Sequence, residues 1–196
     1  MAVNESLPLF PLHAVLLPGA ALGLRVFERR YLDMVSDCGR NGHGFGICLI
    51  LEGEEAGVPA MPAAFGTEAL IEDFDTGEDG LLNLQIRGAR RFHVARTRVR
   101  DNGLVMADVT WCEADLDDAV RPEHALLATL LQHLLEQVGG EHSKVSNARF
   151  DDAAWVGWRL AEFLPISESQ RLALLQEDDV HARLDQLLQL MPAADE

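Results

Sequence analysis

The sequence lacks the features that direct a chain into a membrane or out of the cell. The stretch MAVNES at its start carries one charge, on Glu5, whereas a secretory leader needs basic residues ahead of its apolar segment. The apolar run at residues 7–20 contains Pro8, Pro11 and Pro18. These prolines interrupt any membrane-spanning helix, which needs about twenty apolar residues. We therefore expect the run to belong to the folded protein, with no membrane association and a cytoplasmic location.

Cysteine is scarce. Cys38, Cys48 and Cys112 are odd in number and widely spaced, which is typical of free thiols in a reducing compartment. Cys38, His43 and Cys48 have spacings that match no common zinc motif, and no fourth ligand is evident. The sequence therefore predicts neither disulfides nor a metal site.

Basic charge is scarce relative to acidic charge. The chain has 16 Lys and Arg residues against 32 Asp and Glu residues, for a formal net charge of −16. Such a charge repels phosphate backbones and anionic lipid surfaces. It argues against nonspecific binding to nucleic acid or membranes.

Motifs for familiar enzyme chemistry are also missing. The sequence contains no GxxxxGK[ST] phosphate loop, no GxSxG elbow, no HExxH and no CxxC. Ser143 and Lys144 are neighbours in a polar segment, but a nucleophile and its base must face each other across a structured site. We predict no catalytic residues and no cofactor. An enzyme with a site between two subdomains, using for example His43 or His93, is the weakest of the alternatives.

The first part of the chain, to about residue 117, has the short apolar runs of β-strands. Asp101-Asn102-Gly103 predicts a tight hairpin turn. In the strand RFHVARTRVR, Phe92 and Val94 lie out of phase with Val99, so burying all three predicts a β-bulge or bend near Ala95. Strands are expected at 45–51, 70–74, 80–86, 91–100 and 104–111, and a helix at 29–38.

The remainder has helical periodicity. Leucines between residues 126 and 135 form an apolar stripe that ends at Gly139-Gly140, and a second helix capped by Asp151 or Asp152 stops at Pro165. Ser167 and Gln170 predict a capping box for a third helix, and Asp178-Asp179 caps a fourth at 181–191. The fold class is therefore α+β, with a β-rich domain at 1–117 and a helical bundle at 118–196.

Two basic features invite a nucleic-acid interpretation. The Arg-rich strand would present Arg90, Arg96, Arg98 and Arg100 to RNA, although nearby acidic residues such as Asp108 favour cross-strand ion pairs instead. The last two helices resemble a helix-turn-helix, but only Arg171 and Arg183 offset their acidic surface. RNA binding stays the alternative hypothesis.

The opening LPLFPLHAVLLPGAALGLRVFERRYLDMV resembles the start of the N-terminal domain of Lon-type ATP-dependent proteases. The resemblance continues in FGTEALIEDF, with Gly66 and Thr67, in IRGARRFHV, with Gly88, Arg91 and Phe92, and in the closing segment that begins LAEFLPISESQRLALLQ. It covers nearly the whole chain. It implies a PUA-like β pseudo-barrel followed by a helical subdomain, without the ATPase and peptidase modules of the full protease.

The resemblance also implies a role. In Lon proteases this domain helps to recognise and hold protein substrates, so we expect a non-catalytic protein that binds unfolded or peptide segments of other proteins, as an adaptor or in quality control. An ATP-dependent protease is an implied partner, and homo-oligomerisation is left open. We expect the contacts on an adaptable apolar loop at 53–66, unless its side chains fold back to cover a sheet edge. The candidate contact residues are Val58, Pro59, Met61, Pro62 and Phe65.

Overall fold

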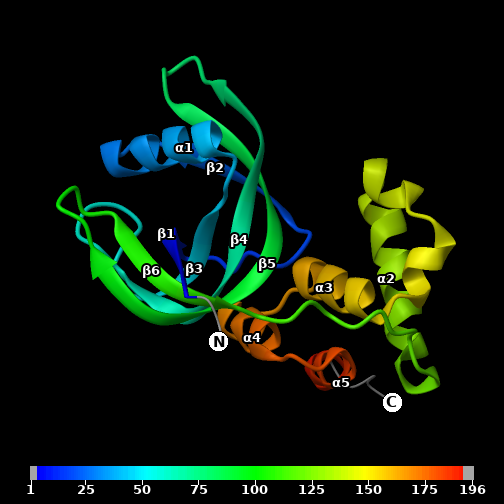
Figure 1. Ribbon diagram of the computed structural model, residues 1–196. Coiled ribbons are helices and arrows are strands. Elements are labelled where there is room, and N and C mark those ends of the chain that lie inside the picture. The colour runs from blue at the N-terminus through cyan, green and yellow to red at the C-terminus, as the bar shows by residue number, and fades with distance from the viewer. Residues whose placement is uncertain (1–3, 192–196) are drawn as a thin grey trace. The chain divides into compact units, whose positions relative to one another are not determined.

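The computed structural model describes residues 4–191 and divides the chain into two compact units, Met1–Cys112 and Glu113–Glu196 (Figure 1). Among the described residues, the first unit contains six strands and one helix. Its elements are β1 (Glu5–Leu12), β2 (Ala21–Val26), α1 (Arg29–Asn41), β3 (Phe45–Glu52), β4 (Met61–Thr76), β5 (Leu82–Val99) and β6 (Val105–Trp111).

The strands form one sheet in the order β2-β5-β4-β3-β1-β6, and β6 also pairs with β5, which closes the sheet on itself. The β1–β3 pair is parallel and the other pairs are antiparallel. Inside the closed sheet the core is apolar. One buried cluster of this core consists of Leu7, Leu9, Cys48, Phe92, Val105, Ala107 and Val109.

The charge-free opening run forms β1 and the turn that follows it. β1 changes partner along its length: Glu5 to Pro8 pair with β6, whereas Leu9 to Leu12 pair with β3. Pro8 and Pro11 therefore lie in an internal strand of the sheet, but each of them is paired with a neighbouring strand on one side only. A proline lacks the amide hydrogen needed for a second ladder, so the change of partner accommodates both prolines.

The hairpin and bulge predictions are confirmed. Gly103 has a φ of 87° in the turn between β5 and β6, and the β5–β6 register shifts between Val94 and Arg96. One premise of the bulge prediction was wrong, because Val99 is 55% exposed and is not a core residue. The predicted strand lengths were also too short: β4 and β5 are continuous strands of 16 and 18 residues that form a long hairpin arm.

Two glycines explain why the closed sheet can pack so tightly around Phe92. A Cβ on Gly66 would lie 2.5 Å from the Ile47 carbonyl oxygen and 2.6 Å from Phe92 Cζ. A Cβ on Gly46 would lie 2.7 Å from the same ring atom. Neighbouring Thr67 is buried, and its hydroxyl donates to the Leu16 carbonyl oxygen at 2.6 Å.

The second unit is helical. Its main helices are α2 (Ala125–Val138), α3 (Ala153–Phe163), α4 (Glu168–Gln176) and α5 (Val180–Leu190), with short 3-10 turns at Pro122–His124, Gly140–Lys144 and Asn147–Asp151. The predicted caps are confirmed: Asp152 accepts from the Trp155 amide, Ser167 and Gln170 form the capping box, and Asp179 accepts from the Ala182 amide. Within residues 4–191, no helix is long and apolar enough to span a membrane.

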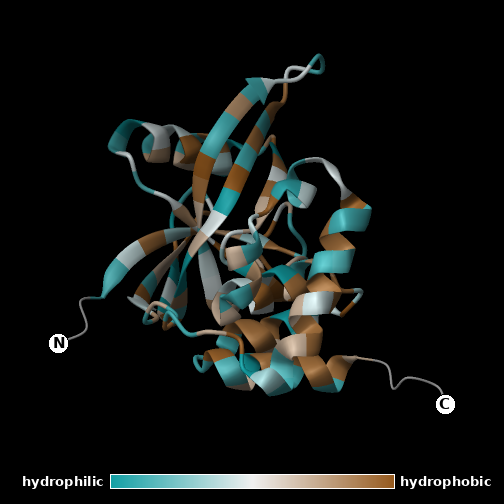
Figure 2. Cartoon of the chain, turned by 90° about the vertical axis from the view of Figure 1, so that its right-hand side faces the viewer, coloured by the Kyte–Doolittle hydropathy of each residue, from teal (hydrophilic) through white to brown (hydrophobic). Residues whose placement is uncertain are grey.

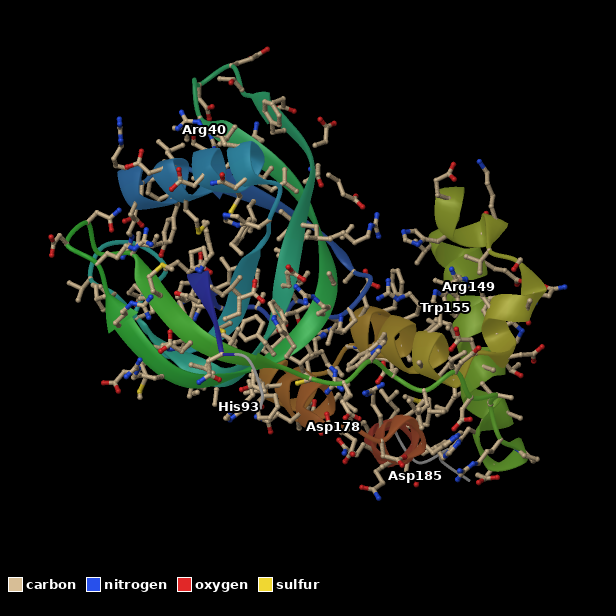
Figure 3. All side chains as sticks on the ribbon, in the orientation of Figure 1. Arg40, His93, Arg149, Trp155, Asp178 and Asp185 are labelled. Carbon is tan, nitrogen blue, oxygen red and sulfur yellow. The ribbon has the colours of Figure 1, made fainter. Side chains whose placement is uncertain are left out.

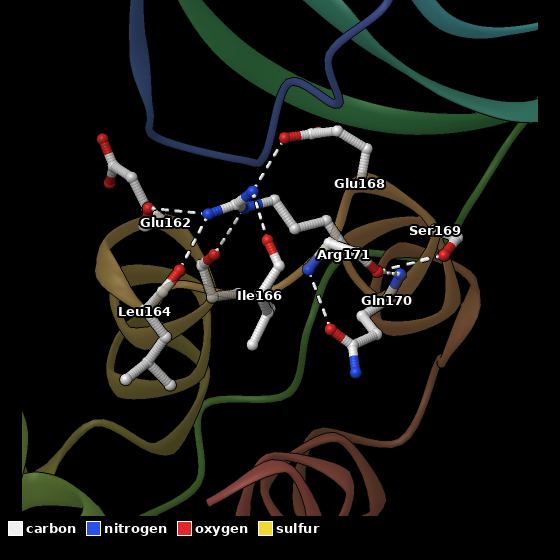
Figure 4. Close-up of polar contacts among 9 residues, drawn as sticks. Glu162, Leu164, Ile166, Glu168, Ser169, Gln170 and Arg171 are labelled. Carbon is white, nitrogen blue, oxygen red and sulfur yellow. Dashed lines mark hydrogen bonds and ion pairs between the residues drawn. The ribbon is translucent and has the colours of Figure 1, made fainter.

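The two arginines expected on the acidic helical surface have structural roles instead. Arg171 closes the end of α3 by donating to the carbonyl oxygens of Ala161, Leu164 and Ile166 at 2.9–3.0 Å, and its guanidinium pairs with Glu168 at 2.7 Å (Figure 4). Arg183 is fully buried and pairs with Asp115 at 2.9 Å. The expectation of Arg183 at the surface was wrong, because its charge pairs with the largely buried carboxylate of Asp115 and stacks on the Trp158 ring.

Candidate functional site

An apolar groove lies in the first unit, between α1 and the arm formed by β4 and β5. Its volume is about 580 Å³. The helix supplies Leu32, Val35 and Gly39, and the arm supplies Leu70 and Phe74. Leu70 is 44% exposed and Phe74 is 69% exposed, which is unusual for large apolar side chains on a sheet. We call this set the α1–β4 groove.

The local sequence explains why the groove is open. α1 buries Tyr31, Met34 and Cys38 against the sheet, so the neighbouring positions Leu32 and Val35 face away from the core and line the groove. On the arm, apolar and polar residues alternate along the strands, and Figure 2 shows the resulting hydrophobic bands among hydrophilic ones. No described segment of the first unit fills the space between these surfaces.

Sequence reasoning missed the groove as a site, although it anticipated both of its walls. The helix at 29–38 and the strand at 70–74 were each predicted separately. Their proximity depends on the length of the arm, which carries Phe74 well past the point where β3 begins. The only local signal is the turn TGEDG, which predicts a hairpin but not which surface the hairpin faces.

The predicted contact loop at 53–66 is only partly a loop. β4 begins at Met61, where it pairs with Glu52 of β3, and Pro62 pairs with Ile50. Strand pairing has therefore overridden the turn signal of the Pro-rich sequence, and Met61, Pro62 and Phe65 are strand residues. Val58 and Pro59 lie in the loop itself, which ends at Ala60. The assignment of these five residues to a contact surface stays a prediction.

Their exposure differs. Val58 is 82% exposed and Met61 is 50% exposed, whereas Pro59, Pro62 and Phe65 are half-buried. The Phe65 ring contacts the ring of His93 on β5, labelled in Figure 3, edge to face with centroids 4.9 Å apart. Phe65 thus covers part of the sheet, while Val58 and Met61 project from it.

The arginines of β5 are engaged with acidic partners. Arg96 and Arg98 both donate to Asp108, at 2.6 and 2.8 Å, and these hydrogen bonds, the one from Arg96 foremost, hold the pKa of Asp108 below its usual range. The cross-strand pairing expected from the sequence is confirmed, since Arg96 is the register partner of Asp108. Arg100 follows the strand and is exposed.

Arg90 lies apart from this group. Its guanidinium stacks 3.6 Å from the centroid of the Trp111 ring and donates to Glu68 at 2.9 Å. The hydrogen bond with Glu68, the largest influence, raises the pKa of Arg90. RNA binding by Arg90, Arg96, Arg98 and Arg100 stays a prediction, and three of these side chains already neutralise carboxylates.

The fold and the groove together define a two-unit α+β protein with an open apolar site beside a long β-hairpin. The chain belongs to the family described as the ATP-dependent protease La (LON) substrate-binding domain, which matches residues 6–193. A comparison with curated proteins found no match.

Two solved structures resemble the chain. The crystal structure of a Lon N-terminal domain protein from Xanthomonas campestris is 63% identical, with a TM-score of 0.83 over 96% of this chain and 99% of that one. The N-terminal domain of the Mycobacterium avium complex Lon protease is 17% identical, with a TM-score of 0.67 over 94% of this chain and 97% of that one. The second comparison demonstrates a shared fold.

Proposed function

We propose that this protein binds unfolded or peptide segments of other proteins and that it does not itself catalyse a reaction. The observation that carries the proposal is the α1–β4 groove, an open apolar site in a chain that belongs to a substrate-binding family. Exposed apolar surface of this kind marks interaction sites, since water disfavours it in the absence of a partner. An adaptor or quality-control role in the cytoplasm, in cooperation with an ATP-dependent protease, follows as the biological context of such binding.

Three finer assignments belong to the same proposal. The first unit is assigned to the PUA-like class. The domain boundary proposed from the sequence, near residue 117, lies shortly after the division between the compact units at Cys112. Val58 and Met61 provide a second apolar contact surface beside the half-buried Pro59, Pro62 and Phe65. An unfolded segment long enough to reach both surfaces would gain affinity from binding them together.

Binding to a permanently unfolded protein tests the proposal. A reduced and alkylated model protein, labelled with a fluorophore, is titrated with the chain and followed by fluorescence anisotropy. Replacing both Leu70 and Phe74 with Asp puts charge into the groove while leaving the core untouched. Each of these side chains can contribute about 1–2 kcal/mol through burial, or about 2–4 kcal/mol together, so we expect a loss of affinity between about thirtyfold and nearly a thousandfold.

Matched variants make the result specific. Val99→Asp is the control, because Val99 is an exposed apolar residue on β5 outside both surfaces, and we expect it to bind like the unmodified chain. Val58→Asp with Met61→Asp measures the second surface separately. The absence of saturable binding by the unmodified chain would refute the proposed function.

A further inference from the structure

We propose that the α1–β4 groove binds an extended polypeptide segment as an added strand on the edge of β4, with Lys or Arg flanking its apolar side chains. This inference rests on the proposed function and specifies how the site recognises its ligand. Strand addition to an open sheet edge uses main-chain hydrogen bonds for affinity and side-chain pockets for selectivity.

The edge of β4 is open where it borders the groove. β3 pairs with β4 only as far as Phe45 opposite Ala69, because the chain before Phe45 turns away into the end of α1. From Leu70 to Thr76, β4 pairs with β5 on one side and with no other described strand. An added strand would therefore continue in line with β3 along the same edge.

The hydrogen bonds of the arm identify the amides that face this edge. The Gly77 amide donates to the Leu81 carbonyl oxygen at 2.9 Å across the hairpin turn. Alternate residues of a strand point their backbone amides to opposite sides. The amides of Asp73 and Asp75 therefore point toward β5, and the amide of Phe74 points to the open edge. Consistent with this, the Phe74 amide donates to the side chain of Asp73 at 2.8 Å instead of to a strand. That exposed side-chain partner can be exchanged for a peptide carbonyl oxygen.

The groove provides space for alternate side chains of the added strand. Successive side chains of a strand point to opposite faces, so every second residue would enter the groove and the others would face solvent. On the helix wall, a Cβ at Gly39 would have no neighbour within 4 Å, which leaves a depression one turn beyond Val35. Apolar side chains of moderate size fit this lining.

The charge of the arm selects for basic residues beside the apolar ones. Glu72 pairs with Arg87 and Asp79 pairs with Arg25, so these carboxylates are neutralised. Asp73, Asp75 and Glu78 have no ion pair with any residue in the described range 4–191; Asp75 accepts a hydrogen bond from the uncharged Asn83 amide at 2.9 Å. An added strand would run beside this uncompensated negative charge. Lys or Arg at its solvent-facing positions would be attracted, and Asp or Glu repelled.

The same charge disfavours a second copy of the chain as the occupant. Pairing two β4 edges would bring Asp73 and Asp75 of one copy against those of the other. Like charges directly opposite each other destabilise strand pairs. A foreign, basic segment meets no such repulsion, so we assign the edge of β4 to a segment of this kind.

Peptides with modified backbones test the mode of binding. The probe is an acetylated, amidated peptide in which Val and Lys alternate, and two derivatives carry N-methyl groups on either the Val or the Lys residues. Only alternate amides of an added strand bond to β4. We therefore expect one derivative to bind at least about tenfold more weakly than the parent and the other to bind equally well. A Val–Glu peptide is expected to bind more weakly than the Val–Lys peptide, with a difference that decreases as salt is added.

Variants of the protein provide the reciprocal test. Phe74→Pro removes the edge amide without breaking the β4–β5 ladder, and Phe74→Leu keeps the amide with an apolar side chain. The proline variant is expected to lose at least about tenfold more affinity than the leucine variant. Amide hydrogen exchange at Phe74 is expected to slow when the peptide binds, while amides on the outer edge of β2 remain unchanged.

The outcomes separate the two proposals. If the unfolded model protein binds but both N-methylated peptides bind like the parent, or protection appears on β2 instead, strand addition is refuted and the proposed function stands. Dimerisation of the free chain through β4, detected by the same exchange pattern, would also refute it. If neither the unfolded protein nor any peptide binds, the proposed function itself fails.

Discussion

Arg183 provides a sharp test of how the helical unit is held together. Its side chain is fully buried, and its guanidinium lies 3.6 Å from the centroid of the Trp158 ring. It donates to both carboxylate oxygens of Asp115, at 2.9 and 3.2 Å, and to the Glu177 carbonyl oxygen at 2.7 Å. Asp115 also accepts from the Trp158 indole at 2.6 Å. The perturbation is Arg183→Met, which keeps an unbranched apolar stem over the ring and removes the charge.

The expected loss in the free energy of unfolding follows from the carboxylate that the substitution leaves without its partner. The side chain of Asp115 is 16% exposed, so losing Arg183 leaves a largely buried carboxylate without its counter-charge. Removing one partner of a buried pair costs about 3–5 kcal/mol. Adding Asp115→Asn removes the uncompensated charge and keeps an acceptor for the Trp158 indole. We therefore expect the double variant to recover about 2 kcal/mol of the loss.

Urea unfolding measures both quantities. Trp155 and Trp158 lie in the helical unit and report its transition by fluorescence. With a slope of about 2 kcal/mol per molar urea, the single variant should lower the midpoint by about 2 M. A shift below about 0.5 M, or a double variant no more stable than the single one, would show that Asp115 and Arg183 do not act as a coupled buried pair.

Two further predictions concern the first unit. Gly66→Ala should lower the free energy of unfolding by about 1–3 kcal/mol, because the new Cβ would lie 2.5 Å from the Ile47 carbonyl oxygen. Gly39→Ala should raise it by about 0.5–1 kcal/mol, because Gly39 lies in a helix and a Cβ there would have no neighbour within 4 Å. Thermal melts of the two variants compare these effects. Burial raises the pKa of the Cys48 thiol to about 12, so this thiol stays protonated at pH 8. A thiol reagent should therefore modify the half-buried Cys112 first and Cys48 only on unfolding. Peptide mass spectrometry after timed modification measures this order. Rapid modification of Cys48 in the folded chain would contradict its burial.

The sequence predicted features that are encoded locally. Asn102-Gly103 specifies its turn through a positive φ angle, and the Ser167–Gln170 capping box specifies its helix start through two reciprocal hydrogen bonds. Both depend on residues within a few positions of each other. Periodicity likewise separated the β-rich part from the helical part, because the two patterns repeat at 2.0 and 3.6 residues.

Features that depend on distant partners were harder to predict. Met61 and Pro62 look like loop residues in the sequence, but they are held in β4 by pairing with Glu52 and Ile50. Arg183 looks like a surface residue until Asp115, far from it in the chain, is placed beside it. The α1–β4 groove is of the same kind, because each wall is predictable and their juxtaposition is set by the tertiary fold.

The change of partner along β1 has a consequence for how the chain is made. Glu5 pairs with Val109, so the first strand cannot complete its ladder until the last strand of the unit has left the ribosome. Leu9 to Leu12 can pair with β3 much earlier during synthesis. Pairings between residues so distant in sequence form slowly, and unpaired strand edges of nascent chains are prone to aggregate. Until synthesis has passed Val109, the first half of β1, from Glu5 to Pro8, therefore lacks its partner strand.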